Sequence, residues 1–374
     1  EAAASRLINR RRDCLGVRGV LQNQFRQLPA IDWFNVVKAP PLPCRMADTD
    51  EDGGAWPVQT VYDEVRGDGL AASRHIHRGE AVLRVAPLVA VPCSTSAARR
   101  CATCLAALGS TPGGAASSPC GHCGVAVLCG RCAAVGARGA ALHGDECDAW
   151  ALLARGLGPA GLGMGTPDVL LLLRLLLACR RHERGQLPPD HMAADADGED
   201  IIADSFDAVG QLVSVEDVAL VPATMAVLME QAKATKLLAP AWARCSLEAC
   251  LELASALQLN GMEITEAPKR RRRGLPARGH SAWAQGATIG MGLYPSAALL
   301  NHSCAPNCRL NFGDDGCLTV SATEDVGPGT ELTITYIDTR EPCAARRAKL
   351  AERYGFECSC HRCCSGGSGG RTPG

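Results

Sequence analysis

The chain has 374 residues, of which 47% are hydrophobic and 21% charged, and its formal net charge is −1. This length and apolar content predict a sizeable buried core and exclude a largely disordered chain. Because the charges nearly cancel, attraction of the whole surface to nucleic acid or to a membrane is excluded, and any such contact must come from a local patch.

The first residues predict an extension rather than a domain. The sequence begins with Glu1 and ends in small residues, which suggests a fragment with a frayed tail. Residues 1–58 mix basic, acidic and proline-rich pieces, and we expect a linker there. No leader-like stretch is evident, so we expect a nuclear or cytoplasmic protein. The apolar run Val169–Cys179 is too short to span a bilayer and contains Arg174, which predicts a buried helix and no membrane contact.

Four further segments follow in chain order. Short strands are predicted from Val61 to Pro92, with a turn at Gly67-Asp68-Gly69. Residues 101–147 hold seven Cys and have little apolar periodicity, so they can fold only around metal. Residues 150–258 are rich in Leu and Ala at helical spacing. Strands return up to Tyr336, and a helix and a last Cys cluster follow, which together predict an α+β fold with an inserted metal module.

The metal module offers four close pairs of ligands. These are Cys101 and Cys104, Cys120 and Cys123, Cys129 and Cys132, and His143 and Cys147. A C-x2-C pair lets both sulfurs face one ion across a tight turn, so the eight ligands suffice for two tetrahedral zinc sites. Such pairs are poor disulfide partners and good chelators in a reducing compartment. Scattered core thiols are the weaker alternative, and His122 could substitute for one ligand.

The order of these pairs resembles the MYND zinc finger, in which the pairs interleave. The resemblance implies one ion held by Cys101, Cys104, Cys129 and Cys132, and another held by Cys120, Cys123, His143 and Cys147. The third pair departs from the family, which usually has C-x3-C there, and Leu128 replaces a common aromatic residue. MYND modules bind short peptides, so the resemblance also implies recruitment of partner proteins.

Two strings in the C-terminal part carry the chemistry. Asn301-His302-Ser303-Cys304 is a polar knot after an apolar run, so its side chains must be satisfied internally or by a ligand. Gly329 to Tyr336 predicts a turn followed by an alternating strand with Tyr336 at its end. Taken alone, the first could be a structural turn and the second a structural tyrosine.

In this order the strings resemble the SET domain of protein lysine methyltransferases, and the MYND-like module narrows the resemblance to the SMYD subfamily, in its arthropod-type form. The implied fold is a β-rich α+β SET domain with a pseudoknot, split by the zinc module and a helical segment and closed by a post-SET zinc cluster. The implied divisions are 1–58 linker, 59–100 first SET part, 101–147 MYND module, 148–256 helical insert, 257–340 second SET part, 341–364 post-SET segment and 365–374 tail.

The resemblance also implies methyl transfer from S-adenosylmethionine to a lysine of a histone or non-histone protein. The implied cofactor-binding residues are Arg66, Gly67, Asp68, Gly69, Asn260, Asn301, His302, Tyr336 and Phe356. Tyr336 and Tyr354 are the implied catalytic residues, because Tyr336 orients the lysine nitrogen and Tyr354 completes the lysine channel. For Phe356 an ordinary core aromatic residue is the weaker alternative.

The last cluster supplies three sulfurs, from Cys358, Cys360 and Cys363, and a closed zinc site needs a fourth ligand. The post-SET resemblance implies Cys304 for that place, although Cys364 or His361 could compete. About three zinc ions are then expected in all. Cys308 and Cys317 are predicted to be buried thiols.

The basic tract of residues 269–273 is a solvated loop, a nuclear import signal, or a contact for DNA phosphates or an acidic protein surface. The rival to an enzyme is a catalytically silent SET and MYND adaptor that recruits partners in transcriptional regulation. Retention of Tyr336, Asn301 and His302 favours the enzyme. A DNA-binding zinc finger ranks last, because the spacing offers no recognition helix.

Overall fold

The computed structural model describes residues 56–109, 119–134, 138–157, 166–184, 202–203, 209, 212, 220, 222–266, 287–313 and 316–365. In chain order the elements are β1 (Val58–Asp63), β2 (Gly67–Ala72), β3 (Ala81–Ala86), β4 (Val89–Pro92), α3 (Gly130–Ala133), α4 (Arg138–Leu157), α5 (Thr166–Glu183), β5 (Ile202–Ala203), α6 (Pro222–Leu238), α7 (Leu247–Asn260), β6 (Gly261–Thr265), β7 (Thr288–Leu293), α8 (Pro295–Ala298), β8 (Asn301–His302), β9 (Cys308–Phe312), β10 (Leu318–Ala322), β11 (Glu331–Ile334), α9 (Cys343–Tyr354) and α10 (His361–Ser365).

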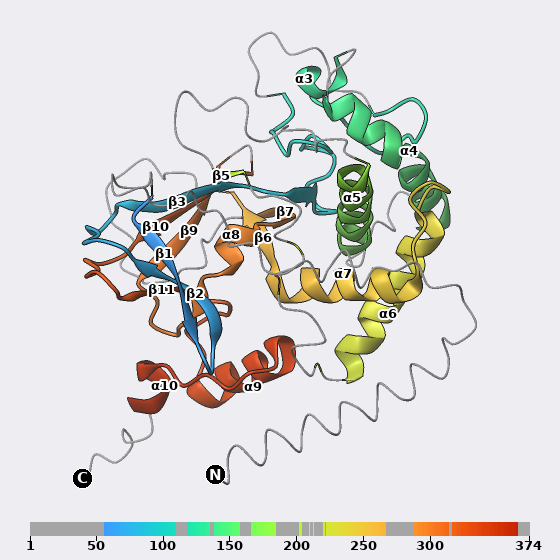
Figure 1. Cartoon of the computed structure of the whole chain (residues 1–374). Coiled ribbons are helices and arrows are strands. Elements are labelled where there is room, and N and C mark those ends of the chain that lie inside the picture. The colour runs from blue at the N-terminus through green and yellow to red at the C-terminus, as the bar shows by residue number, and fades with distance from the viewer. Residues whose placement is uncertain are drawn as a thin grey trace, which may run out of the picture.

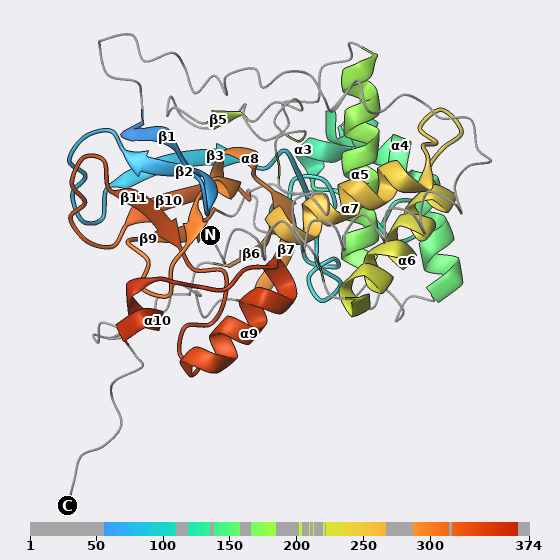
Figure 2. The same cartoon turned by 60° about the horizontal axis from the view of Figure 1, so that its bottom comes forward.

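The described strands form three small sheets, in the orders β1-β2-β11-β8, β5-β3-β10-β9 and β4-β7-β6. Neighbouring strands are antiparallel except in the pairs β8–β11 and β3–β5, which are parallel. Figures 1 and 2 show the sheets on one side of the molecule, helices α4 to α7 on the other, and α9 with α10 beyond the sheets. The parallel β8–β11 pair places Asn301 and His302 beside Thr333 and Ile334.

Each side has its own core. Helix α5 is buried over most of its circumference, including every leucine from Leu170 to Leu177, because α4, α6, α7 and β4 surround it. A second core fills the space between the sheets and includes Leu70, Leu83 and Leu332. The predicted order of strands, helices and strands is therefore found. The strands and the helices have separate cores, and β4 and β7 contribute residues to both.

The turn between β1 and β2 lies at residues 64–66, three residues before the turn predicted at Gly67-Asp68-Gly69. The carboxylate of Asp63 accepts hydrogen bonds from the backbone N–H groups of Val65 and Arg66, at 2.9 and 2.8 Å, which ends β1 and turns the chain earlier. Gly67 then opens β2 with a φ of 75°, a conformation that favours glycine.

Two of the expected divisions fall inside helices. Helix α4 runs across the boundary expected between residues 147 and 148, and α7 runs across the one expected between 256 and 257. The zinc module and the helical insert are therefore joined by a continuous helix. The basic tract 269–273 lies outside the described residues, as do positions 1–55 and 366–374 of the expected linker and tail.

Candidate active site and metal centres

Twelve ligand residues come together in three groups of four. The groups are Cys101, Cys104, Cys129 and Cys132; Cys120, Cys123, His143 and Cys147; and Cys304, Cys358, Cys360 and Cys363. Within each group the ligand atoms lie within 4.8 Å of one another. The Sγ–Sγ distances are 3.7 Å for Cys104–Cys129, 3.6 Å for Cys120–Cys147 and 3.5 Å for Cys304–Cys363. Sulfurs bound about 2.3 Å from a central zinc lie about 3.8 Å apart, so the three groups have the size of tetrahedral zinc sites.

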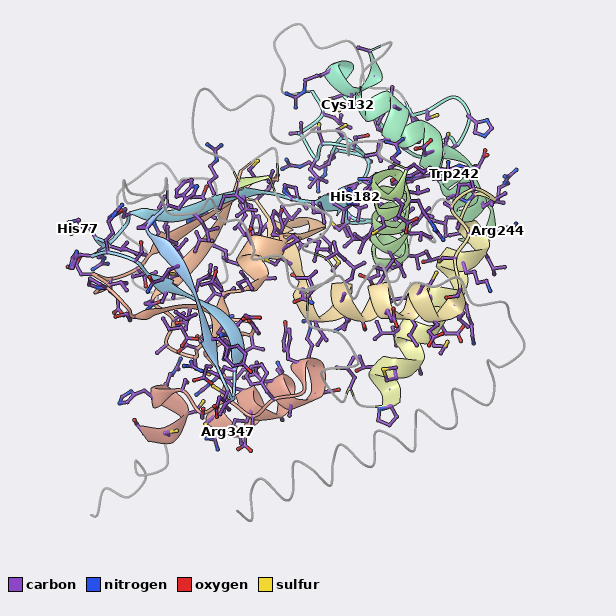
Figure 3. The ribbon with its side chains drawn as sticks, in the orientation of Figure 1. His77, Cys132, His182, Trp242, Arg244 and Arg347 are labelled. Carbon is purple, nitrogen blue, oxygen red and sulfur yellow. The ribbon has the colours of Figure 1, made fainter. Side chains whose placement is uncertain are left out.

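The third Cys pair, which has the unusual spacing, is placed by a short helix. Cys129 caps α3 and Cys132 lies within it, with Ala133 N–H donating to the carbonyl of Cys129 at 2.9 Å. Residues three apart share one face of a helical turn, so the C-x2-C spacing directs both sulfurs the same way. Figure 3 labels Cys132, which belongs to α3.

The competing ligands point elsewhere. His122 is exposed, and its Nε2 lies 2.8 Å from a carboxylate oxygen of Asp148. Cys364 is exposed and donates to the carbonyl of Ser359 at 3.3 Å, whereas the His361 ring lies against Ser365. Cys308 and Cys317 are buried thiols, in agreement with the sequence prediction.

Four rings form an aromatic cluster at the end of β11. These belong to His302, Tyr336, Tyr354 and Phe356. Ring centroids are 5.3 Å apart for His302–Tyr336, 5.0 Å for Tyr336–Tyr354 and 6.0 Å for His302–Phe356. Gly355 caps α9 with a φ of 74° and turns the chain so that Tyr354 and Phe356 both reach the cluster. Phe356 is 36% exposed, which excludes the alternative of a fully buried core residue.

Tyr336 is held at both its hydroxyl and its backbone. The hydroxyl donates to the carbonyl of Leu300 at 2.7 Å, and the backbone N–H donates to Nδ1 of His302 at 3.0 Å. Burial raises the pKa of the Tyr336 phenol, which keeps it protonated, and burial lowers the pKa of His302 to about 4, which keeps its ring neutral and able to accept. The His302 ring of the polar string therefore finds a hydrogen-bond partner within the chain, in the backbone of Tyr336.

The start of β2 and the side chain of Asn301 meet across the first sheet. The Asn301 amide donates to the carbonyl of Asp68 at 3.2 Å and to the carboxylate of Glu331 at 3.1 Å. Arg66 forms an ion pair with the same carboxylate. A Cβ at Gly69 would lie 2.9 Å from the Asn301 amide nitrogen, so only glycine fits there without displacement. Glu331 was missed by sequence reasoning, because its role depends on the pairing of β11 with β2.

Asn260 does not belong to the first sheet. It ends α7, and its amide donates to the carbonyl of Ala256 at 2.7 Å, while the strand that follows joins β4 and β7. Gln258 and Gly261, which are close to Asn260 in sequence, line a small pocket together with Arg353 of α9.

The third ligand group joins the two halves of the aromatic cluster. Cys304 follows His302 by two residues, and its Sγ lies 3.4 Å from Nε2 of that ring. Cys358 follows Phe356 by two residues. An ion in this group would therefore fix the segment with Phe356 against the segment with His302.

The SET domain family model matches residues 67–337, and the chain belongs to the SET domain family. Among its curated relatives, the human histone-lysine N-methyltransferase SMYD3 is 48% identical over 75 residues, which are 20% of this chain and 17% of that protein. Histone-lysine N-methyltransferase ASHR1 of Arabidopsis thaliana is 26% identical over 303 residues, which are 80% of this chain and 53% of that protein. The chain thus spans about half of ASHR1 and less than a fifth of SMYD3. The solved SET domain of LSMT bound to lysine and AdoHcy overlaps 80% of this chain and 53% of that chain, with a TM-score of 0.36 at 16% identity.

The family match and the three ligand groups confirm the predicted α+β SET fold with inserted Cys clusters and the resemblance to SMYD proteins. The arthropod-type form stays a prediction. Among the described residues, helices long and apolar enough to cross a membrane are absent.

Proposed function

We propose that this chain is an S-adenosylmethionine-dependent protein-lysine N-methyltransferase, acting on histone or non-histone proteins. The observation that carries the proposal is the aromatic cluster of His302, Tyr336, Tyr354 and Phe356, with Tyr336 held at both ends. Membership of the SET domain family supports it, as do relatives named histone-lysine N-methyltransferases. A nuclear or cytoplasmic location is part of the proposal.

The proposed cofactor site lies at the start of β2. S-adenosylmethionine, when bound, supplies a methyl group on a positively charged sulfur. We assign its binding to Arg66, Gly67, Asp68, Gly69, Asn260, Asn301, His302, Tyr336 and Phe356. The missing side chain of Gly69 makes room for the Asn301 amide against the backbone of β2, and the Glu331 carboxylate holds both Asn301 and Arg66 beside it.

The proposed chemistry needs positioning more than acid–base catalysis. A neutral lysine nitrogen must approach the methyl carbon in line, with little water present. As the new N–C bond forms, the S–C bond breaks, and the surplus proton on nitrogen leaves to solvent. The Tyr336 hydroxyl donates to Leu300, so its oxygen is fixed and keeps lone pairs that can accept from the lysine N–H. Tyr354 and Phe356 then form walls that exclude water.

We further propose about three zinc ions per chain, one in each ligand group. The two in residues 101–147 stabilise a MYND-type module that binds partner peptides. The third closes the aromatic cluster. Contact of the tract 269–273 with an acidic surface or nucleic acid is a separate proposal, which rests on its five consecutive positive charges.

Purified protein, labelled cofactor and a panel of histones and cell lysate proteins test the enzyme. Tyr336→Phe should lower methyl transfer about 100-fold, because the acceptor that orients the amine is lost. Tyr294→Phe is the matched control, since it removes another buried hydroxyl that donates to a carbonyl, that of Gly316 at 2.6 Å, and Tyr294 is not one of the four rings of the cluster. This control should retain transfer.

The adaptor alternative predicts a different outcome. Binding of the cofactor without transfer to any protein of the panel would refute the enzyme and support the silent adaptor. If wild type and Tyr336→Phe transfer methyl equally, the proposed role of Tyr336 is refuted but the enzyme proposal is not.

A further inference from the structure

Arg346 of α9 lies inside the third ligand group although it is not one of the ligands. Its side chain is buried, with 4% of the residue exposed. Nε donates to Sγ of Cys304 at 3.2 Å and Nη2 donates to Sγ of Cys363 at 3.4 Å. Nη1 donates to the carbonyl of Glu341 at 2.6 Å, just before the helix begins. One guanidinium therefore binds sulfurs from two segments that are far apart in sequence.

The charge of the group explains why a cation is needed there. Four thiolates around one divalent zinc ion carry a net charge of −2, and burying such a charge is costly unless it is paired. A guanidinium stays protonated at every physiological pH, so the positive charge of Arg346 reduces the net negative charge from −2 to −1. Its N–H groups also hydrogen-bond to two of the sulfurs, which fixes these sulfurs in position around the ion and makes the metal harder to release.

We propose that Arg346 is a positioning residue that retains zinc in the Cys304, Cys358, Cys360 and Cys363 group and thereby holds Phe356 against His302. The inference rests on the zinc sites and the methyltransferase proposed above. Because Arg346 and Tyr354 belong to the same helix, loss of the guanidinium loosens both walls of the proposed channel.

The test compares Arg346→Ala, Arg346→Lys and the control Arg347→Ala in the full chain. Arg347 is the next residue, but it donates to the carbonyl of Cys358 at 3.2 Å and pairs with Glu357 at 3.2 Å rather than touching a sulfur. Figure 3 labels it on α9. The control therefore removes an equal charge near the site without removing an N–H···S bond.

Zinc affinity is measured by competition with a chromogenic chelator, in which the two module zincs serve as internal references. In Arg346→Ala we expect one zinc to bind about 10- to 100-fold more weakly and the other two to be unchanged. Arg346→Lys should fall between wild type and Arg346→Ala, since it keeps the charge but not the two-pronged geometry. Arg347→Ala should match wild type.

Methyl transfer provides the second readout. Arg346→Ala should raise the KM for the cofactor and lower kcat, and excess zinc should restore part of both. The inference is overturned if Arg346→Ala keeps its zinc affinity, if it loses all three zincs together, or if Arg347→Ala loses as much. Should wild type fail to transfer methyl while only Arg346 variants lose zinc, the inference on Arg346 stands and the proposed function fails.

Discussion

Arg174 of α5 and Glu146 of α4 form an ion pair whose two side chains are both 2% exposed. Nε and Nη2 donate to the two carboxylate oxygens, each at 2.7 Å. The guanidinium also donates to the carbonyls of Ala90 and Ala102. Replacing Arg174 by Met keeps much of the volume but leaves the carboxylate to a 3.4 Å hydrogen bond from Trp150. We expect this change to be among the most destabilising in the chain.

Removing one partner of a buried ion pair costs about 3–5 kcal/mol, and each stranded carbonyl adds about 1 kcal/mol or more. The free energy of unfolding should therefore fall by at least about 5 kcal/mol in Arg174→Met. In Arg174→Met/Glu146→Leu the unpaired charge is gone as well, so the double variant should be more stable than Arg174→Met alone. Lys233→Met, which breaks the exposed pair with Glu230, should cost about 1 kcal/mol at most.

Urea unfolding in excess zinc measures these differences, followed by both circular dichroism and tryptophan fluorescence. Coincident transitions would justify a single free energy for each variant. A cost for Arg174→Met no larger than that of Lys233→Met contradicts the reasoning. The single variant Glu146→Leu completes the comparison. A double variant whose loss of stability equals the summed losses of Arg174→Met and Glu146→Leu also contradicts the reasoning, because the two side chains would then not interact.

Two further predictions concern the glycine strand and the third metal site. Gly69→Ala should weaken cofactor binding in titration calorimetry by about tenfold or more, because the new Cβ displaces Asn301, whereas Gly327→Ala, whose Cβ has 3.8 Å of clearance, should leave it unchanged; equal losses would count against a specific contact. Cys360→Ser should lower the zinc content in elemental analysis from about three ions to about two, whereas Cys364→Ser should keep all three; the reverse pattern would make Cys364 the ligand.

The metal ligands could be predicted from sequence because C-x2-C spacing is a local constraint. Two sulfurs three residues apart face one ion whatever the rest of the fold does. The assignment of Cys304 to the last cluster required the family resemblance, since 54 residues separate it from Cys358. Helix α5 could also be predicted from the sequence, because a run of leucines that contains one Arg is typical of a buried helix.

Contacts between strands could not be read in the same way. Glu331 joins Arg66 and Asn301 only because β11 pairs with β2 on one side and β8 on the other. The turn before β2 shifted because the Asp63 side chain competes for backbone N–H groups, an effect that glycine positions alone do not reveal. Arg174 could be predicted to be buried, but its partner Glu146 lies 28 residues away and required the packed helices.

The parallel pairing of β8 with β11 also determines when the site can form. The Asn307 amide donates to the carbonyl of Glu331 at 2.8 Å and accepts from the N–H of Thr333 at 2.8 Å, so it closes a long loop of chain. Closing such a loop costs more conformational entropy than closing the tight β1–β2 turn does. A chain that has formed only its β1–β2 hairpin already presents Gly69, yet Asn301 and Tyr336 reach their places only after this closure. The proposed site is therefore assembled only when β8 and β11 are paired, and a chain without that pairing lacks two of its residues.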